Sequence, residues 1–443
     1  MPRKGLLGPL IILLLGVLFL LKNFRPDIPV WDLFGKYWPL LLILWGLAKL
    51  IEAARPPQPG VPSRPLITGG EVFLVIFLCL IGAGVAGVRD IGRGVSFRWP
   101  GVFMETFHYT AETKLALAEK QPKITVYNPR GDIRITGTDS AEIQVRAEKQ
   151  VQARNETEAK KLDEMARLEV VKEGDGYVVR SNADRAEGQG TVTVSLEVQL
   201  PKGAILDVQA RRGDVQISQV AGAVSLNVER GDVRLQDLGD KVRVDLRRGS
   251  FSAERIKGNI EMDGRGGDLQ VNDVDGEVVI RGEYSGNINF ANVKKVLHFT
   301  SSRTELEIQR LPGKVDLTIG SLTVTQPSGP VTVNTKAKDI RIEDFDGPIQ
   351  IINRDASVEL STTKTPVPSI DVDNKSGRIE VTLPTNGSFQ VEGNARRGEV
   401  NSDFSEVTAN QEHEQGTLRG GVGKNGPTVK LNTTYGSISI RKS

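Results

Sequence analysis

The tripeptide Arg-Gly-Asp occurs three times in the chain, at 130–132, 212–214 and 230–232. This tripeptide is widely known as a cell-attachment signal, so the three copies could each contact a receptor. They could also be one structural position that repeats along the chain. The residues around them decide between these two readings.

Few other residues suggest chemistry. His108, His298 and His413 are too far apart in the sequence to suggest a metal pair, and His298 falls beside an apolar strand pattern that favours a structural role. The chain contains no G-x-S-x-G, H-E-x-x-H or P-loop motif. We therefore predict no catalytic residues, no cofactor-binding residues, no metal site and no enzymatic activity.

Composition excludes other classes. The formal net charge is +2, and the basic residues alternate with acidic ones rather than clustering, so we expect no nucleic-acid partner. Cys79 is the single cysteine, which rules out an intrachain disulfide and a cysteine-based zinc cluster. Glu71 lies at the edge of an apolar run and is interpreted as interfacial rather than as a functional intramembrane acid.

Residues 1–90 are predicted to be a transmembrane region. They contain three apolar runs, at about 5–21, 37–51 and 72–88, each near the lower length limit of a spanning helix. The alternative is a signal peptide followed by buried helices, but no A-x-A cleavage pattern follows the first run. A juxtamembrane linker is expected at 91–121.

Loop charges do not orient these spans. With the N-terminus in the cytoplasm, five basic residues would lie inside and six outside. Arg3 and Lys4, next to the first run, favour a cytoplasmic N-terminus. The C-terminal part is then expected outside the cytoplasm of a multi-pass bacterial membrane protein that contacts the lipid bilayer through its N-terminal helices.

An 18-residue repeat dominates the rest of the chain. The pattern Gly-Asp-Val-x-Ile/Leu and its variants begin at successive positions separated mostly by 18 residues: Gly213, Gly231, Gly249, Gly267, Gly286, Thr304, Gly320, Lys338 and Ala356. Two and four residues after each start the side chain is apolar, giving columns such as Val215, Val233, Phe251, Leu269, Ile288, Leu306 and Leu322. Polar residues alternate with them, as in half-buried strands. Residues 122–443 are therefore predicted to form an all-β, right-handed parallel β-solenoid with coils of about 18 residues.

The repeat explains the tripeptides. Gly213 and Gly231 occupy one corner of successive coils, where a positive φ or a close approach is needed. The Asp that follows belongs to a column of Asp, Asn and Ser, which are turn residues that bond their own backbone. We expect the preceding arginine column (Arg212, Arg230 and Arg248) to offset the charge of the stacked aspartates.

Two segments depart from the repeat. Residues 153–170 are predicted to be a helical excursion, with Asn155 as a cap, that covers one end or side of the solenoid. Residues 405–428 are polar and rich in glycine, and are expected to form a mobile loop.

Two family resemblances accompany these patterns. "GLLGPLIILLLGVLFLLKNF" followed by "WDLFGKYWPLLLILWGLAKLI" resembles the LiaI–LiaF-like transmembrane module of bacterial envelope proteins. "VYNPRGDIRITG", "LPTNGSFQVEGNARRGEVNSDF" and "GPTVKLNTTYGSISI" resemble the bacterial putative-adhesin family of β-solenoid domains, which covers about 120–443. The second resemblance implies a β-solenoid without an assigned activity.

Three function classes follow. We expect a membrane-anchored envelope protein whose solenoid is a binding or scaffold surface, acting in cell-envelope stress response or adhesion, with an envelope protein or polymer as partner. A self-assembling solenoid scaffold would need uncapped terminal coils. A polysaccharide-active β-helix enzyme would need clustered acids on one outward face, and the outward column that begins with Gln216 and Arg234 is mixed.

Overall fold

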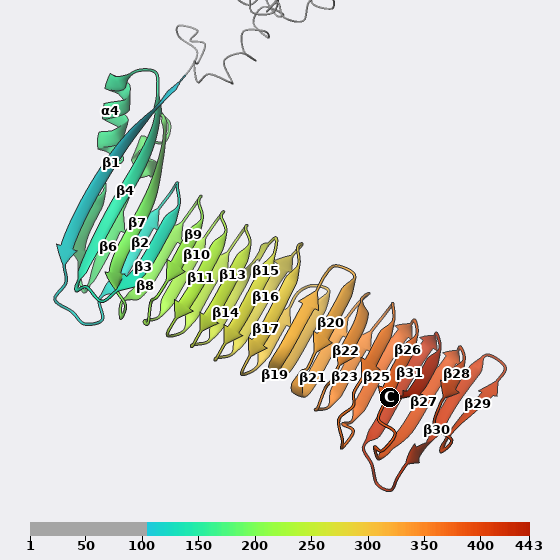
Figure 1. Cartoon of the computed structure of the whole chain (residues 1–443). Helices are drawn as coiled ribbons and strands as arrows, with labels where there is room; N and C mark the ends of the chain where they lie inside the picture. Colours follow the sequence, from blue (N-terminus) through green and yellow to red (C-terminus); the bar gives the residue numbers. More distant parts are fainter. Residues whose placement is uncertain (1–103) are drawn as a thin grey trace, which may run out of the picture. The chain divides into compact units, whose positions relative to one another are not determined.

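The structure is a computed structural model that describes residues 104–443, which form one compact unit. The three apolar runs and their predicted helices lie outside the described residues. Within residues 104–443, no helix is long and apolar enough to cross a membrane. The fold of this unit is a two-sheet β-solenoid in which each coil contributes one strand to sheet A and the next to sheet B (Figure 1). The predicted parallel solenoid is confirmed, and its right-handedness stays a prediction.

Sheet A is a stack of strands that are mostly parallel. In spatial order its strands are β1 (Glu105–Ala116), β4 (Glu142–Ala153), β7 (Thr191–Pro201), β3 (Ile133–Thr138), β9 (Val215–Ser218), β11 (Val233–Leu238), β13 (Phe251–Ile256), β15 (Leu269–Val274), β17 (Ile288–Val293), the second half of β19 (Thr304–Leu317), β20 (Ser321–Thr325), β22 (Asp339–Glu343), β24 (Val358–Ser361), β26 (Ile379–Leu383), β32 (Ile438–Lys442) and β28 (Val400–Ser402).

Sheet B runs alongside it. In spatial order its strands are β5 (Glu169–Glu173), β6 (Gly176–Arg180), β2 (Lys123–Asn128), β8 (Ile205–Ala210), β10 (Val224–Val228), β12 (Val242–Leu246), β14 (Ile260–Gly266), β16 (Val278–Tyr284), β18 (Leu297–Thr300), the first half of β19, β21 (Ser328–Thr335), β23 (Ile349–Asn353), β25 (Ile370–Ser376), β31 (Thr428–Tyr435), β27 (Phe389–Arg397), β30 (Gln415–Val422) and β29 (Val407–Glu412).

The parallel register confirms the apolar columns. Val215, Val233 and Phe251 are direct partners in β9, β11 and β13, and all three are buried. The column continues through Leu269 and Ile288. Period-2 alternation places these side chains between the two sheets and the polar ones outside. The repeat therefore builds one continuous core from residues that are 18 positions apart.

The two bends of each coil use different backbone solutions. At the corner that precedes sheet A, Gly231 has a φ of 149°, and a Cβ built on it would lie 2.0 Å from the carbonyl oxygen of Gly213. Only glycine permits this approach. At the other bend, non-glycine residues adopt the left-handed conformation in coil after coil: Gln219, Asp237, Arg255, Asp273, Asn292, Gln326 and Asp344. Asn and Asp tolerate this region better than most residues do.

The parallel stack is interrupted at β19. This strand runs antiparallel to β17 and β18 on one side and to β20 and β21 on the other, crossing from sheet B to sheet A near Pro312. Leu306 was predicted to continue the Val215 column, which is wrong: it lies in sheet B opposite Phe299, whereas Leu317 is the partner of Ile288. Alternation looks the same in both chain directions, so the sequence pattern did not reveal the reversal.

The helical excursion is confirmed, with narrower limits than 153–170. Helix α4 (Glu156–Met165) begins at Asn155, whose side chain accepts a hydrogen bond from the Glu158 backbone N–H at 2.9 Å. Its buried face, Ala159 and Leu162, lies at the N-terminal end of the stack, where α4 contacts β4 and the short 3₁₀ helix η1 (Ala183–Ala186).

Two expectations about connecting segments are corrected. The linker expected at 91–121 contains β1, which pairs along its whole length with β4 because its alternating apolar residues extend sheet A. The loop expected at 405–428 contains the antiparallel hairpin β29–β30, whose Val407 and Leu418 are buried. The final strands β31 and β32 insert between earlier coils, so the chain does not end at the tip of the stack (Figure 1).

Candidate binding surfaces on the solenoid

The aspartates of the tripeptides hold the glycine corner together. Asp214 Oδ1 accepts a hydrogen bond from the Asp232 backbone N–H at 2.8 Å, and Asp232 Oδ1 accepts one from the Ser250 N–H at 2.8 Å. Asp132 does the same for the Asp214 N–H at 2.9 Å. Each carboxylate therefore accepts a hydrogen bond from a backbone N–H of the next coil. This corrects the expectation that these aspartates bond their own backbone, and it supports a structural role for the tripeptide.

The arginines of this corner form a separate column. Backbone hydrogen bonds between coils place Arg130, Arg212, Arg230 and Arg248 one above another. Among the described residues, none of these four guanidinium groups forms an ion pair or a side-chain hydrogen bond, so the expected charge offset by this column involves no direct contact with the aspartates. Like charges about 4.8 Å apart in water repel by about 1 kcal/mol per neighbouring pair before screening.

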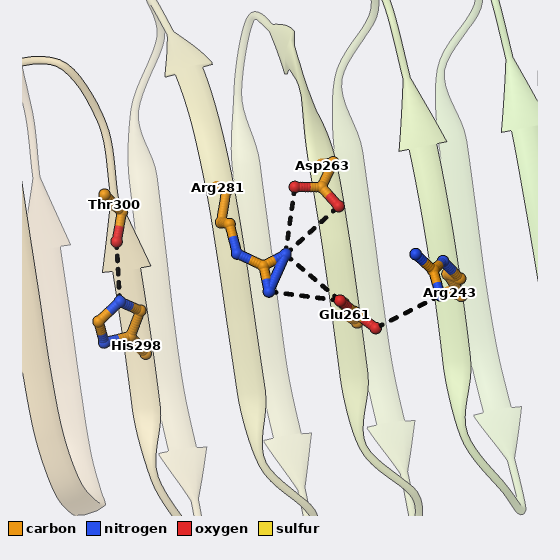
Figure 2. Close-up of polar contacts among 6 residues, drawn as sticks. All are labelled: Arg243, Glu261, Asp263, Arg281, His298 and Thr300. Carbon is orange, nitrogen blue, oxygen red and sulfur yellow. Dashed lines mark hydrogen bonds and ion pairs between the residues drawn. The ribbon is translucent and has the colours of Figure 1, made fainter.

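Several charges on the outward face of sheet B form ion pairs across coils, unlike the arginine column (Figure 2). Arg281 on β16 lies 3.3 Å from both Glu261 and Asp263 on β14, and Arg243 on β12 reaches Glu261 at 3.9 Å. Opposite charges thus alternate between coils. Glu261 and Asp263 are thus engaged by arginine, whereas Asp371 and Asp373 on β25 are exposed on the same face and have no ion pair within residues 104–443.

A groove of about 630 Å³ follows the left-handed bend. Arg255 donates to Asp237 across one coil at 2.6 Å, and this hydrogen bond lowers the pKa of Asp237 and raises that of Arg255. Lys294 and Asp275 form a further ion pair at 2.7 Å. The groove is lined by paired charges of both signs and is exposed, which suits an extended contact better than a catalytic centre.

The three histidines occupy separate places. His108 lies on β1, His413 lies in the turn between β29 and β30, and His298 lies on β18 with its Nε2 2.8 Å from Thr300 Oγ1 (Figure 2). Within residues 104–443, no three His, Cys, Asp or Glu side chains come together in a way that could hold a metal ion. The contacts of His298 are those of a side chain within a polar strand ladder.

Residues 122–441, most of the chain, match the Toastrack DUF4097 family. The chain belongs to that family. Residues 7–105 match the LiaF transmembrane domain. This Toastrack chain is therefore a membrane protein that carries a β-solenoid, in agreement with the two resemblances seen in its sequence. No curated protein matches it.

Solved structures also resemble the chain at 9% sequence identity. A "putative cell adhesion protein" from Clostridium sporogenes covers 76% of this chain and 100% of its own, with a TM-score of 0.18. A "putative adhesin" from Bacteroides fragilis covers 76% and 97%, with a TM-score of 0.19, and one from Parabacteroides merdae covers 75% and 96%, with a TM-score of 0.20. At these values the likeness adds nothing to the family match.

Sequence reasoning missed two features. The left-handed bend was signalled by a column six residues after the corner glycine, in which Asp237, Asp273 and Asn292 are types that adopt this conformation readily. A cavity beside β19 had no signal in the repeat, because it arises where the repeat direction reverses.

Proposed function

We propose that the protein is a membrane-anchored component of the bacterial cell envelope whose solenoid is an extended binding surface. Its N-terminal part would cross the membrane with three helices, at about 5–21, 37–51 and 72–88, leaving the solenoid outside the cytoplasm. Its partner would be a linear anionic polymer of the envelope. Adhesion or envelope-stress response is the setting that such a partner suggests.

The arginine column carries this proposal. On the outward face of sheet B, Arg243 and Arg281 pair across coils with Glu261. At the glycine corner, by contrast, four arginines repel one another, while the aspartates beside them are engaged by backbone N–H groups. A row of unpaired guanidinium groups along the solenoid axis complements a polymer with repeated negative charges.

The two other function classes receive less support. End-to-end polymerisation favours parallel, uncapped terminal coils. Three of the four outermost strands, β1, β5 and β29, pair antiparallel with their neighbours, while β28 pairs parallel with β32, and α4 packs at one end. A polysaccharide-active enzyme favours free carboxylates in a groove, whereas Glu261 and Asp263 both contact Arg281. We infer binding rather than catalysis.

Binding of a fluorescent linear polyphosphate to the full chain in zwitterionic nanodiscs tests the proposal. Replacing Arg212, Arg230 and Arg248 by Gln should weaken binding about tenfold, since each exposed contact contributes about 0.5 kcal/mol. The matched control replaces Arg154, Arg310 and Arg419, which are also exposed and have no ion pair among the described residues, and should bind like the parent. Equal binding by both triple variants would refute the assignment.

Orientation needs a separate experiment. Protease added to intact cells should cleave within the solenoid, and the fragments can be located by mass spectrometry. Cleavage that requires opening of the cytoplasm would refute the proposed topology and, with it, contact with an external polymer.

A further inference from the structure

A second candidate site lies where the solenoid reverses direction. A cavity of about 350 Å³ lies between β16, β18 and the two turns that flank β19. Its lining includes Tyr284, Phe299, Arg303, Ile319 and Lys338. This volume is at the lower end of the range for small-molecule sites.

Lys338 is a buried cation without an acidic partner. It is 7% exposed, and its Nζ donates hydrogen bonds to the backbone carbonyls of Thr318 and Ile319, the latter at 2.8 Å. The other buried lysine of the described unit, Lys149, has Asp163 at 2.7 Å. A buried charge is costly unless it is paired with an opposite charge. Within the described unit, Lys338 therefore lacks the acidic partner that Lys149 has.

Position makes this lysine more unusual. It occupies the corner at which Gly213, Gly231 and Gly249 lie in regular coils. Burial lowers the pKa of Lys338, and the nearby positive charge of Arg303 lowers it further. A neighbouring anion would oppose both effects, because it would stabilise the charged ammonium group.

Tyr284 lines the cavity with its ring rather than with its hydroxyl. Its hydroxyl is buried and has no hydrogen-bond partner among the described residues, whereas buried hydroxyl groups are normally paired. Its ring centroid lies 6.4 Å from that of Phe299, which forms part of an apolar wall. Ile319, 69% exposed, extends this apolar surface to the rim.

One acid also lines the cavity. Glu283 is exposed, and its Oε1 accepts a hydrogen bond from the Ser302 backbone N–H at 2.6 Å. With Lys338 and Arg303 opposite this single carboxylate, the formal charge of the lining is positive. An anion therefore meets two cations, while the remaining acid is already hydrogen-bonded.

We propose that this cavity binds a small organic anion, namely a carboxylate with an apolar body. The carboxylate pairs with Lys338 Nζ and with the Arg303 guanidinium. The apolar body lies against the Tyr284 ring and Ile319. This site does not depend on the polymer surface proposed above, since the arginine column does not line the cavity.

Equilibrium dialysis of radiolabelled octanoate and phenylacetate against the full chain in zwitterionic nanodiscs tests the site. At least one anion should bind the parent. Lys338→Met should abolish binding, and Arg303→Gln should weaken it about tenfold, the loss of one hydrogen bond between charged groups. The controls Lys314→Met and Arg354→Gln alter exposed residues outside the cavity and should bind like the parent.

Stability separates a ligand role from a packing role. Arg303→Gln removes an exposed positive charge that acts on Lys338, so the unliganded variant should melt at or slightly above the parent temperature while binding more weakly. This variant decides the matter if Lys338→Met does not fold. Absence of binding of both anions by the parent, or parent-like binding by folded Lys338→Met or by Arg303→Gln, would overturn the proposal. Inorganic phosphate that competes as well as unlabelled octanoate would also overturn it, because the apolar walls would then contribute nothing.

Discussion

Replacing Gly231 by Ala should destabilise the solenoid more than any change to the charged residues beside it. The new Cβ would lie 2.0 Å from the carbonyl oxygen of Gly213, about 1 Å closer than real contacts of this kind. The φ of 149° is also unfavourable for any residue with a Cβ, at about 1–3 kcal/mol.

Relief of the clash would separate two coils at this corner. Across this junction the Gly213 N–H donates to the Arg230 carbonyl at 3.0 Å, and the Asp232 N–H donates to Asp214 Oδ1 at 2.8 Å. Losing two such bonds costs about 2 kcal/mol, so the total reaches about 3–5 kcal/mol. Asp232→Asn keeps an oxygen acceptor for the Ser250 N–H and should cost under about 1 kcal/mol. Arg230→Ala should cost close to zero, because this guanidinium has no partner among the described residues and repels its neighbours.

Thermal unfolding of the full chain, followed by far-ultraviolet circular dichroism, measures this order. Hydrogen exchange at residues 213–250 locates the effect, because repeat proteins open locally. Equal destabilisation by Gly231→Ala and Arg230→Ala would refute the structural interpretation of the tripeptide. A harmless Gly231→Ala would refute the close packing of the corner.

The remaining predictions concern the core, the helix and the N-terminal end. Val233→Asp buries an unpaired charge and should lower Tm far more than Arg230→Ala or Asp232→Asn; comparable melting temperatures would contradict it. Asn155→Ala removes the cap of α4 and should cost about 1 kcal/mol, seen as faster hydrogen exchange in 156–165; unchanged exchange would argue against the cap. The Lys172 ammonium and the Tyr177 hydroxyl lower the pKa of Glu119 to about 2. The stability that the ionised Glu119 carboxylate gives the fold is therefore complete above pH 4.5 and is lost as pH falls toward 2. An NMR titration that gives Glu119 an ordinary pKa would disprove this coupling.

Much of the candidate surface could be located from the sequence, but its contacts could not. The arginine and aspartate columns follow from the 18-residue spacing, as does the burial of Val233. The Asp232 carboxylate was predicted to bond its own backbone, but in the structure it accepts a hydrogen bond from the Ser250 N–H of the next coil. That prediction failed because spacing gives alignment but not side-chain direction.

The sequence by itself determined the solenoid, because alternation at period 2 combined with a fixed coil length permits only stacked, aligned strands. Tertiary structure alone decided the direction of β19, since an alternating strand has the same inward and outward residues when it runs backwards. It likewise decided that β31 and β32 enter the stack between earlier coils. The cavity around Lys338 is a consequence of that reversal, and so it is found where the repeat pattern gives no guidance.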